Sequence, residues 1–174
     1  MEPSVTEARV GEWLTRFVEG LETLADDDDR TPIEEALALA TSDDGFLGGR
    51  WASLSHTERR FLLVSLAAEL DLDASRLIAE ATQSFSMSRP TVATCITLAG
   101  PDSTQRLLYR KLLMPGSRLV EDGWLRVEGI PGRRWLESEV RVSTAAVQLA
   151  LGQEITGTDL DSLCRVWEPG PTLE

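Results

Sequence analysis

The chain has 174 residues, 42% hydrophobic and 26% charged, with a formal net charge of −12. These values are ordinary for one globular domain with an extension, and the acidic balance argues against a general nucleic-acid binder, because neutralising phosphates requires a basic surface. No apolar run approaches the roughly 18–20 residues that span a bilayer, and the acidic N-terminus, Met1–Ser4, does not have the pattern of a signal peptide. We therefore expect a cytoplasmic protein without membrane insertion.

The first fifty residues predict two helices and an acidic loop. An apolar stripe at spacings of three and four residues indicates a helix of about 20 residues; it comprises Val10, Trp13, Leu14, Phe17, Val18, Leu21 and Leu24. The run 26–29 consists of four aspartates, which repel one another and favour a solvated turn. A second helix is expected at Pro32–Ala40, capped by Thr31, and a loop rich in Gly and Asp follows to residue 50.

Three helices are expected between residues 55 and 99. Ser55 and Glu58 form a capping-box pattern before an almost unbroken apolar run, which predicts a central buried helix. Asp73 is positioned to cap the next helix, and 82–88 is read as a turn in which Phe85 and Met87 fold back onto the core. Pro90 suits the first turn of the third helix, which ends at Gly100-Pro101.

A further helix and a β-ribbon follow. Leu107, Leu108, Leu112 and Leu113 are expected to face inward on the helix, which ends at Pro115-Gly116. Ribbon candidates lie at 118–127, around the turn dipeptide Asp122-Gly123, and at 135–142, where apolar and charged residues alternate. We expect Trp124–Val127 to pair with Leu136–Val142, and Ser143 to cap a last helix closed by Gly152.

These elements predict a mainly α protein with a small antiparallel β-hairpin. The expected architecture is an N-terminal helical extension with an acidic loop (1–50), a winged-helix-like domain (51–152) and a C-terminal tail or linker (153–174). Charge is uneven along it: residues 1–80 carry a net −11, residues 81–150 a net +3 and residues 151–174 a net −4. The mild basicity of the winged part keeps a DNA-binding interpretation open.

The sequence lacks the residues of a catalytic or metal site. The only histidine, His56, falls in an exposed first turn with no nucleophile or metal partner to act with. Cys95 and Cys164 lie among apolar neighbours without the spacing of a zinc or redox motif, and we interpret them as buried thiols. No phosphate-binding loop pattern occurs. We therefore expect no enzymatic activity, no cofactor and no metal.

Two contact surfaces compete in the sequence. A protein-docking module would use aromatic and arginine side chains at the wing; the candidates are Trp124, Arg133, Arg134 and Trp135. A DNA-binding domain would insert its third helix into the major groove, with Arg89, Thr91 and Thr94 near bases and Arg133 and Arg134 at the backbone. The third helix offers threonines but few residues that commonly contact bases, so protein docking is favoured and nucleic acid is the alternative.

Four pieces of residues 53–152 match a known pattern: Phe61–Asp71, Arg89-Pro90-Thr91-Val92, Leu119–Leu125 and Val142–Gly152. On these pieces the segment resembles the winged-helix domain found at the N-terminus of a group of bacterial and archaeal AAA-type ATPases. The resemblance implies a non-catalytic domain that precedes an ATPase module and recruits substrate or helps to assemble the machine, so the implied partner is an ATPase assembly or its substrate. The sequence departs from that pattern because no ATPase domain follows within the 174 residues. A DNA-binding transcriptional regulator is the alternative.

Overall fold

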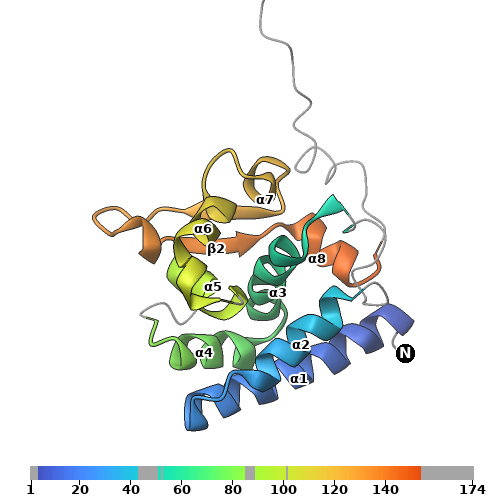
Figure 1. Cartoon of the computed structure of the whole chain (residues 1–174). Helices are drawn as coiled ribbons and strands as arrows, with labels where there is room; N and C mark the ends of the chain where they lie inside the picture. Colours follow the sequence, from blue (N-terminus) through green and yellow to red (C-terminus); the bar gives the residue numbers. More distant parts are fainter. Residues whose placement is uncertain (1–3, 43–50, 52, 85–88, 101, 154–174) are drawn as a thin grey trace, which may run out of the picture.

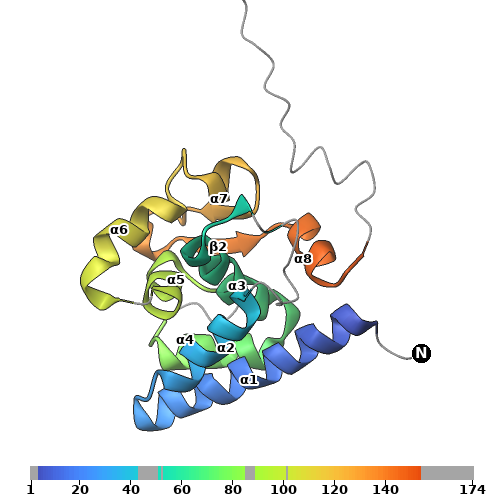
Figure 2. The same ribbon diagram turned by 45° about the vertical axis from the view of Figure 1, so that its right-hand side comes forward.

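A computed structural model describes residues 4–42, 51, 53–84, 89–100 and 102–153. A helical hairpin of α1 (Val5–Asp27) and α2 (Thr31–Thr41) lies along one side of three further helices, α3 (His56–Leu70), α4 (Leu72–Ala81) and α5 (Val92–Ala99). A two-stranded sheet covers the other side (Figures 1 and 2). The architecture is mainly helical with an antiparallel hairpin, which confirms the predicted fold class.

The amphipathic pattern of the N-terminus produces the expected helix. Ser4 and Glu7 form a capping box, in which the Ser4 amide donates to the Glu7 carboxylate at 2.6 Å. The apolar stripe, which includes Trp13 and Phe17, is buried and faces α2, α4 and the last helix. This burial joins the N-terminal helices to the rest of the protein in one hydrophobic core.

The central helix α3 also follows the prediction. Ser55 and Glu58 form a capping box, and the stretch 60–68 is buried all round, as its apolar sequence indicates. It contacts α2, α4, α5 and the sheet. Helices α2, α4 and α5 and the sheet are therefore all positioned against α3.

The starts of α4 and α5 differ from the sequence prediction. The N-cap of α4 is Asp71, whose carboxylate accepts from the Ala74 amide at 2.8 Å, and Asp73 lies within the first turn. The N-cap of α5 is Thr91, so Pro90 precedes the helix. The Pro90 carbonyl accepts a hydrogen bond from the Val140 amide of the sheet at 2.8 Å.

The segment after α5 is more broken than predicted. It consists of η2 (Ser103–Gln105), α6 (Arg106–Arg110) and η3 (Lys111–Leu113), followed by α7 (Arg118–Glu121) where the sequence predicted part of a strand. The expectation that Leu107 and Leu108 face inward is wrong, because the two side chains are exposed and Tyr109 is buried in their place. Leu113 is buried and Leu112 partly buried, as predicted. The short elements change helical pitch, which a single helical periodicity cannot follow.

The hairpin pairs β1 (Leu125–Glu128) with β2 (Glu139–Val142) in antiparallel register, with Leu125 opposite Val142 and Glu128 opposite Glu139. This confirms the predicted pairing. Trp135–Glu137, predicted as the start of the second strand, forms the 3-10 helix η4. An isolated bridge between Thr91 and Glu139 adds a third extended segment next to β2.

The last helix, α8 (Thr144–Ala150), is capped by Ser143 as predicted, and Gly152 follows at φ +70°. The predictions for Phe85, Met87 and Cys164, most of the loop before residue 51, and the C-terminal tail beyond Gln153 lie outside the described residues. Within the described part of the chain, no helix is both long and apolar enough to cross a membrane.

Candidate interaction surface

Helix α5 is the helix that the DNA-binding interpretation would place in the major groove, and its N-terminal end is joined to the sheet. The Val92 amide donates to the Ser138 carbonyl at 2.9 Å, and the Val140 amide donates to the Pro90 carbonyl at 2.8 Å. The helix also packs against α3, α6, η4 and β2. An eight-residue helix enclosed on this many sides has little surface left for a partner.

The exposed surface of α5 is small and lacks charge. Ala93 is exposed and Thr97 is partly exposed, while the other α5 side chains are buried. Thr94 is only 2% exposed and lies 2.9 Å from the Thr91 hydroxyl, and Thr82 extends this chain of hydroxyls at 3.4 Å. The prediction that Thr91 and Thr94 face outward therefore differs from the structure, because their hydroxyl groups satisfy one another inside the fold.

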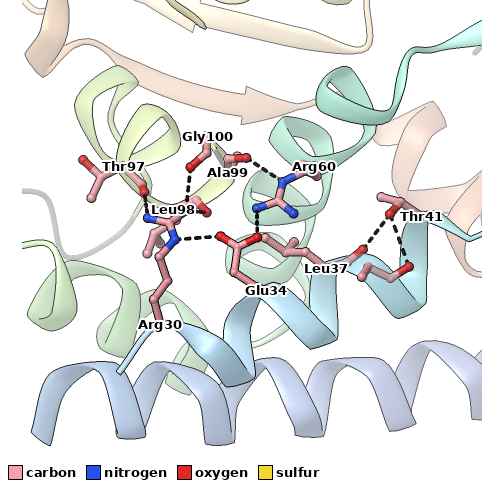
Figure 3. Close-up of polar contacts among 10 residues, drawn as sticks. Arg30, Glu34, Leu37, Thr41, Arg60, Thr97, Leu98, Ala99 and Gly100 are labelled. Atoms are coloured by element: carbon pink, nitrogen blue, oxygen red, sulfur yellow. Dashed lines mark hydrogen bonds and ion pairs between the residues drawn. The ribbon is translucent and has the colours of Figure 1, made fainter. Parts of the chain in front are cut away.

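A buried charge network holds the C-terminal end of α5 (Figure 3). Arg30 donates to the carbonyls of Leu98 and Gly100, both at 2.7 Å, and also to that of Thr97. Arg60, 3% exposed, donates to the Ala99 carbonyl at 2.7 Å. These guanidinium groups satisfy carbonyls that the helix end leaves without intrahelical donors.

Glu34, from α2, joins the two arginines. Its carboxylate oxygens lie 2.6 Å from Arg30 Nε and 2.6 Å from Arg60 Nη2. A charge as deeply buried as that of Arg60 requires a nearby opposite charge. Sequence reasoning missed this network because its members are far apart in the chain, and only Arg30 and Glu34 have a recognisable spacing of four residues.

The loop between β1 and β2 presents the exposed arginines. Gly132 adopts φ +79°, and the Arg133 amide closes the turn on the Ile130 carbonyl at 3.0 Å. Arg133 and Arg134 are exposed, whereas Trp135 is half-buried and packs against the core. The predicted arginines therefore lie together at the tip of the hairpin, with one aromatic side chain at their base.

Trp124 lies in the core, away from this tip. It is 9% exposed, and its ring lies 5.3 Å from that of Trp51, centroid to centroid. This burial removes Trp124 from the side chains that a partner can readily reach. This differs from its expected role as an exposed anchor.

A hollow of about 190 Å³ lies between the turn after α4, helix α5 and the loop of the hairpin. Hydroxyl and amide groups from the turn and from α5 line one side, and Arg133, Leu136 and Glu137 line the other. Arg133 is the predicted site residue that both lines this hollow and is exposed at the tip. The hollow and the tip are therefore one continuous surface, which we call the wing surface.

Arg89 lies beside this surface but is already paired. Its guanidinium lies 3.8 Å from the Glu139 carboxylate, and its side chain is about one-third exposed. The pair connects the entry of α5 to β2. The positive charge of Arg89, which DNA binding would use at this end of the helix, is therefore partly offset by an adjacent carboxylate.

A family model for the winged helix domain, variant, matches residues 31–160. The chain belongs to this family. No curated protein and no solved structure matches the chain. The match begins at Thr31, so α2 with Glu34, and Arg60 of α3, fall inside the matched region of the winged helix domain, and Arg30 directly precedes it. The predicted domain boundary at residue 51 stays a prediction.

Titratable chemistry in this winged helix domain is limited among the described residues. Burial raises the pKa of the Cys95 thiol to about 12, which keeps it protonated and unreactive. Burial, followed by the charges of Arg60 and Arg59, lowers the pKa of His56. No group of three or more His, Cys, Asp or Glu side chains in the described part of the chain could hold a metal ion.

Proposed function

We propose that this winged helix domain is a non-catalytic protein-interaction module that recruits a partner through the wing surface. The observation that carries the proposal is the burial of α5. A helix that reads base edges needs projecting polar side chains, whereas α5 exposes Ala93 and part of Thr97. Its polar groups are already hydrogen-bonded, either to the Thr91 hydroxyl or to the arginine network.

The wing surface has the properties of a small protein-docking site. Arg133 and Arg134 are free of the enclosing contacts that bury α5, and Trp135 supplies apolar area beside them. Arginine and tryptophan are enriched among residues that dominate binding energy at protein interfaces. The resemblance to domains preceding AAA-type ATPases supports an ATPase assembly, or its substrate, as the partner.

The test is site-specific photocrosslinking in cells that make the full chain. A benzophenone amino acid replaces Arg134 in one variant and Glu22, exposed on α1, in a control. We expect a protein adduct from position 134 that position 22 does not give, with mass spectrometry identifying an AAA-type ATPase or a protein bound to one. Adducts at 134 made only with nucleic acid would contradict the proposal.

DNA binding is the alternative function, favoured by the net +3 charge of residues 81–150. It predicts affinity for duplex DNA that falls steeply with salt and is lost in Arg89→Ala. The buried α5 leads us to expect no retarded band in a gel shift with random duplexes at low salt. A retarded band that depends on Arg89 would replace the adaptor interpretation.

A further inference from the structure

The segment formed by α6, η3 and the residue after it exposes large apolar side chains. Leu107 is 71% exposed, Leu108 55% and Met114 48%. Within the described residues, these are three of the six large hydrophobic side chains found exposed, and they fall within eight positions. Scattered single hydrophobic residues need no explanation, but a cluster at one place indicates a contact surface.

Basic residues are interspersed with these apolar side chains in the sequence. From Thr104 to Arg118 the sequence has four basic residues and no acidic one, in a chain whose net charge is −12. Arg118 donates to the Ser53 carbonyl. In the part of the chain that the structure describes, Arg106, Arg110 and Lys111 form no ion pair. We call the set Arg106, Leu107, Leu108, Arg110, Lys111 and Met114 the α6 patch.

The complementary pattern occurs in the sequence of the C-terminal segment, residues 154–174. It contains five acidic residues and one arginine. Leu160, Leu163 and Trp167 recur at i, i+3 and i+7, a spacing that places apolar side chains on one side of a helix. An acidic segment with an apolar stripe fits a basic surface with exposed leucines in both charge and hydrophobicity.

The described part of the chain ends beside the start of α1. Gly152 lies against Thr6 at the start of α1, where an added Cβ would meet the Thr6 side chain at 3.1 Å. In Figure 2 α6 lies at the left edge of the molecule and α8 on its right. The segment begins on the side of the molecule away from α6, and we take a second molecule as its acceptor. Binding within one copy would instead leave the protein monomeric in sedimentation velocity.

We propose that residues 154–174 of one copy bind the α6 patch of a second copy. The contact is head-to-tail, because the two copies use different surfaces, and repetition of such a contact forms a ring or an open filament. The proposal does not depend on the wing surface, which is a separate region of the fold.

The direct test measures binding of a fluorescein-labelled peptide with the sequence of residues 154–174 to the full-length protein by fluorescence anisotropy. We expect saturable binding at low salt that weakens as salt screens the charges. Leu107→Ser/Leu108→Ser should reduce the affinity by at least about tenfold, since two buried leucines contribute more than one decade. Leu72→Ser, at an 89% exposed leucine on α4, is the matched control and should bind as wild type does.

Two further measurements complete the test. A scrambled peptide of the same composition should bind at least about tenfold more weakly, because it loses the apolar stripe. Sedimentation velocity of the full chain should show association that Leu160→Ser/Leu163→Ser abolishes. Four results would each overturn the proposal. The scrambled peptide could bind equally well, or Leu107→Ser/Leu108→Ser could keep wild-type affinity. The peptide could fail to bind at low salt, or the protein could bind anionic lipid vesicles without the peptide. Thermal melts of the variants should match the wild type because the mutated leucines are exposed.

Discussion

Replacing Glu34 tests whether the arginine network holds α5 to α2. Glu34→Ala leaves the guanidinium of Arg60, 3% exposed, without its carboxylate at 2.6 Å. Removing one partner of a buried ion pair costs about 3–5 kcal/mol. Because the Glu34 side chain is itself 32% exposed, water partly replaces it, and we expect the low end of this range, about 3 kcal/mol.

Urea unfolding followed by circular dichroism measures this free energy of unfolding. Glu35→Ala is the matched control, since Glu35 is the exposed next residue and should change stability by less than about 0.5 kcal/mol. Adding Arg60→Met to Glu34→Ala removes the unpaired charge, so the double variant should lose less stability than the sum of the single variants. A loss below about 1 kcal/mol in Glu34→Ala would refute the role assigned to the network.

Three further outcomes are expected. Gly11→Ala should stabilise α1 by about 0.5–1 kcal/mol because no atom lies within 4 Å of the added Cβ. Gly20→Ala should destabilise α1 because the Cβ would lie 2.9 Å from the α2 backbone. The melting temperature should therefore rise in Gly11→Ala and fall in Gly20→Ala. In a Cys164→Ser variant, native Cys95 should resist maleimide at neutral pH and react only after unfolding, since its pKa is about 12; native labelling would contradict its burial. NMR titration of His56 should give a pKa below 6.5. The free energy of unfolding should fall as the pH decreases below 6.5, because the folded state binds the His56 proton less tightly than the unfolded state does. His56→Gln should remove this pH dependence, and a measured pKa at or above 6.5 would contradict the effect of burial.

The sequence predicted those helix starts and turns that depend on residues close together in the chain. Capping boxes, the apolar stripe of α1 and the cap at Ser143 act within four residues of sequence, and the structure confirms them. The turn at Asp122-Gly123 was also recognisable, although the residues before it form α7 and not a strand. Leu119 is buried in either conformation, so hydrophobicity alone could not distinguish the two.

The parts of the candidate site that sequence did not predict depend on tertiary contacts. Thr94 looked like a residue of the exposed face because threonine is polar, but a partner hydroxyl three residues away allows its burial. Trp124 looked like an anchor, yet Trp51, distant in sequence, covers it. Arg133 and Arg134 were placed correctly at the tip because loops between strands are usually at the surface.

The two ends of α5 are fastened to different parts of the molecule. The N-terminal end is hydrogen-bonded to β2, and the C-terminal end is held by Arg30, which precedes α2, and by Arg60 of α3. Helix α5 therefore connects the start of α2 to the hairpin through one continuous series of hydrogen bonds. A displacement of α2 would be expected to shift β2 as well.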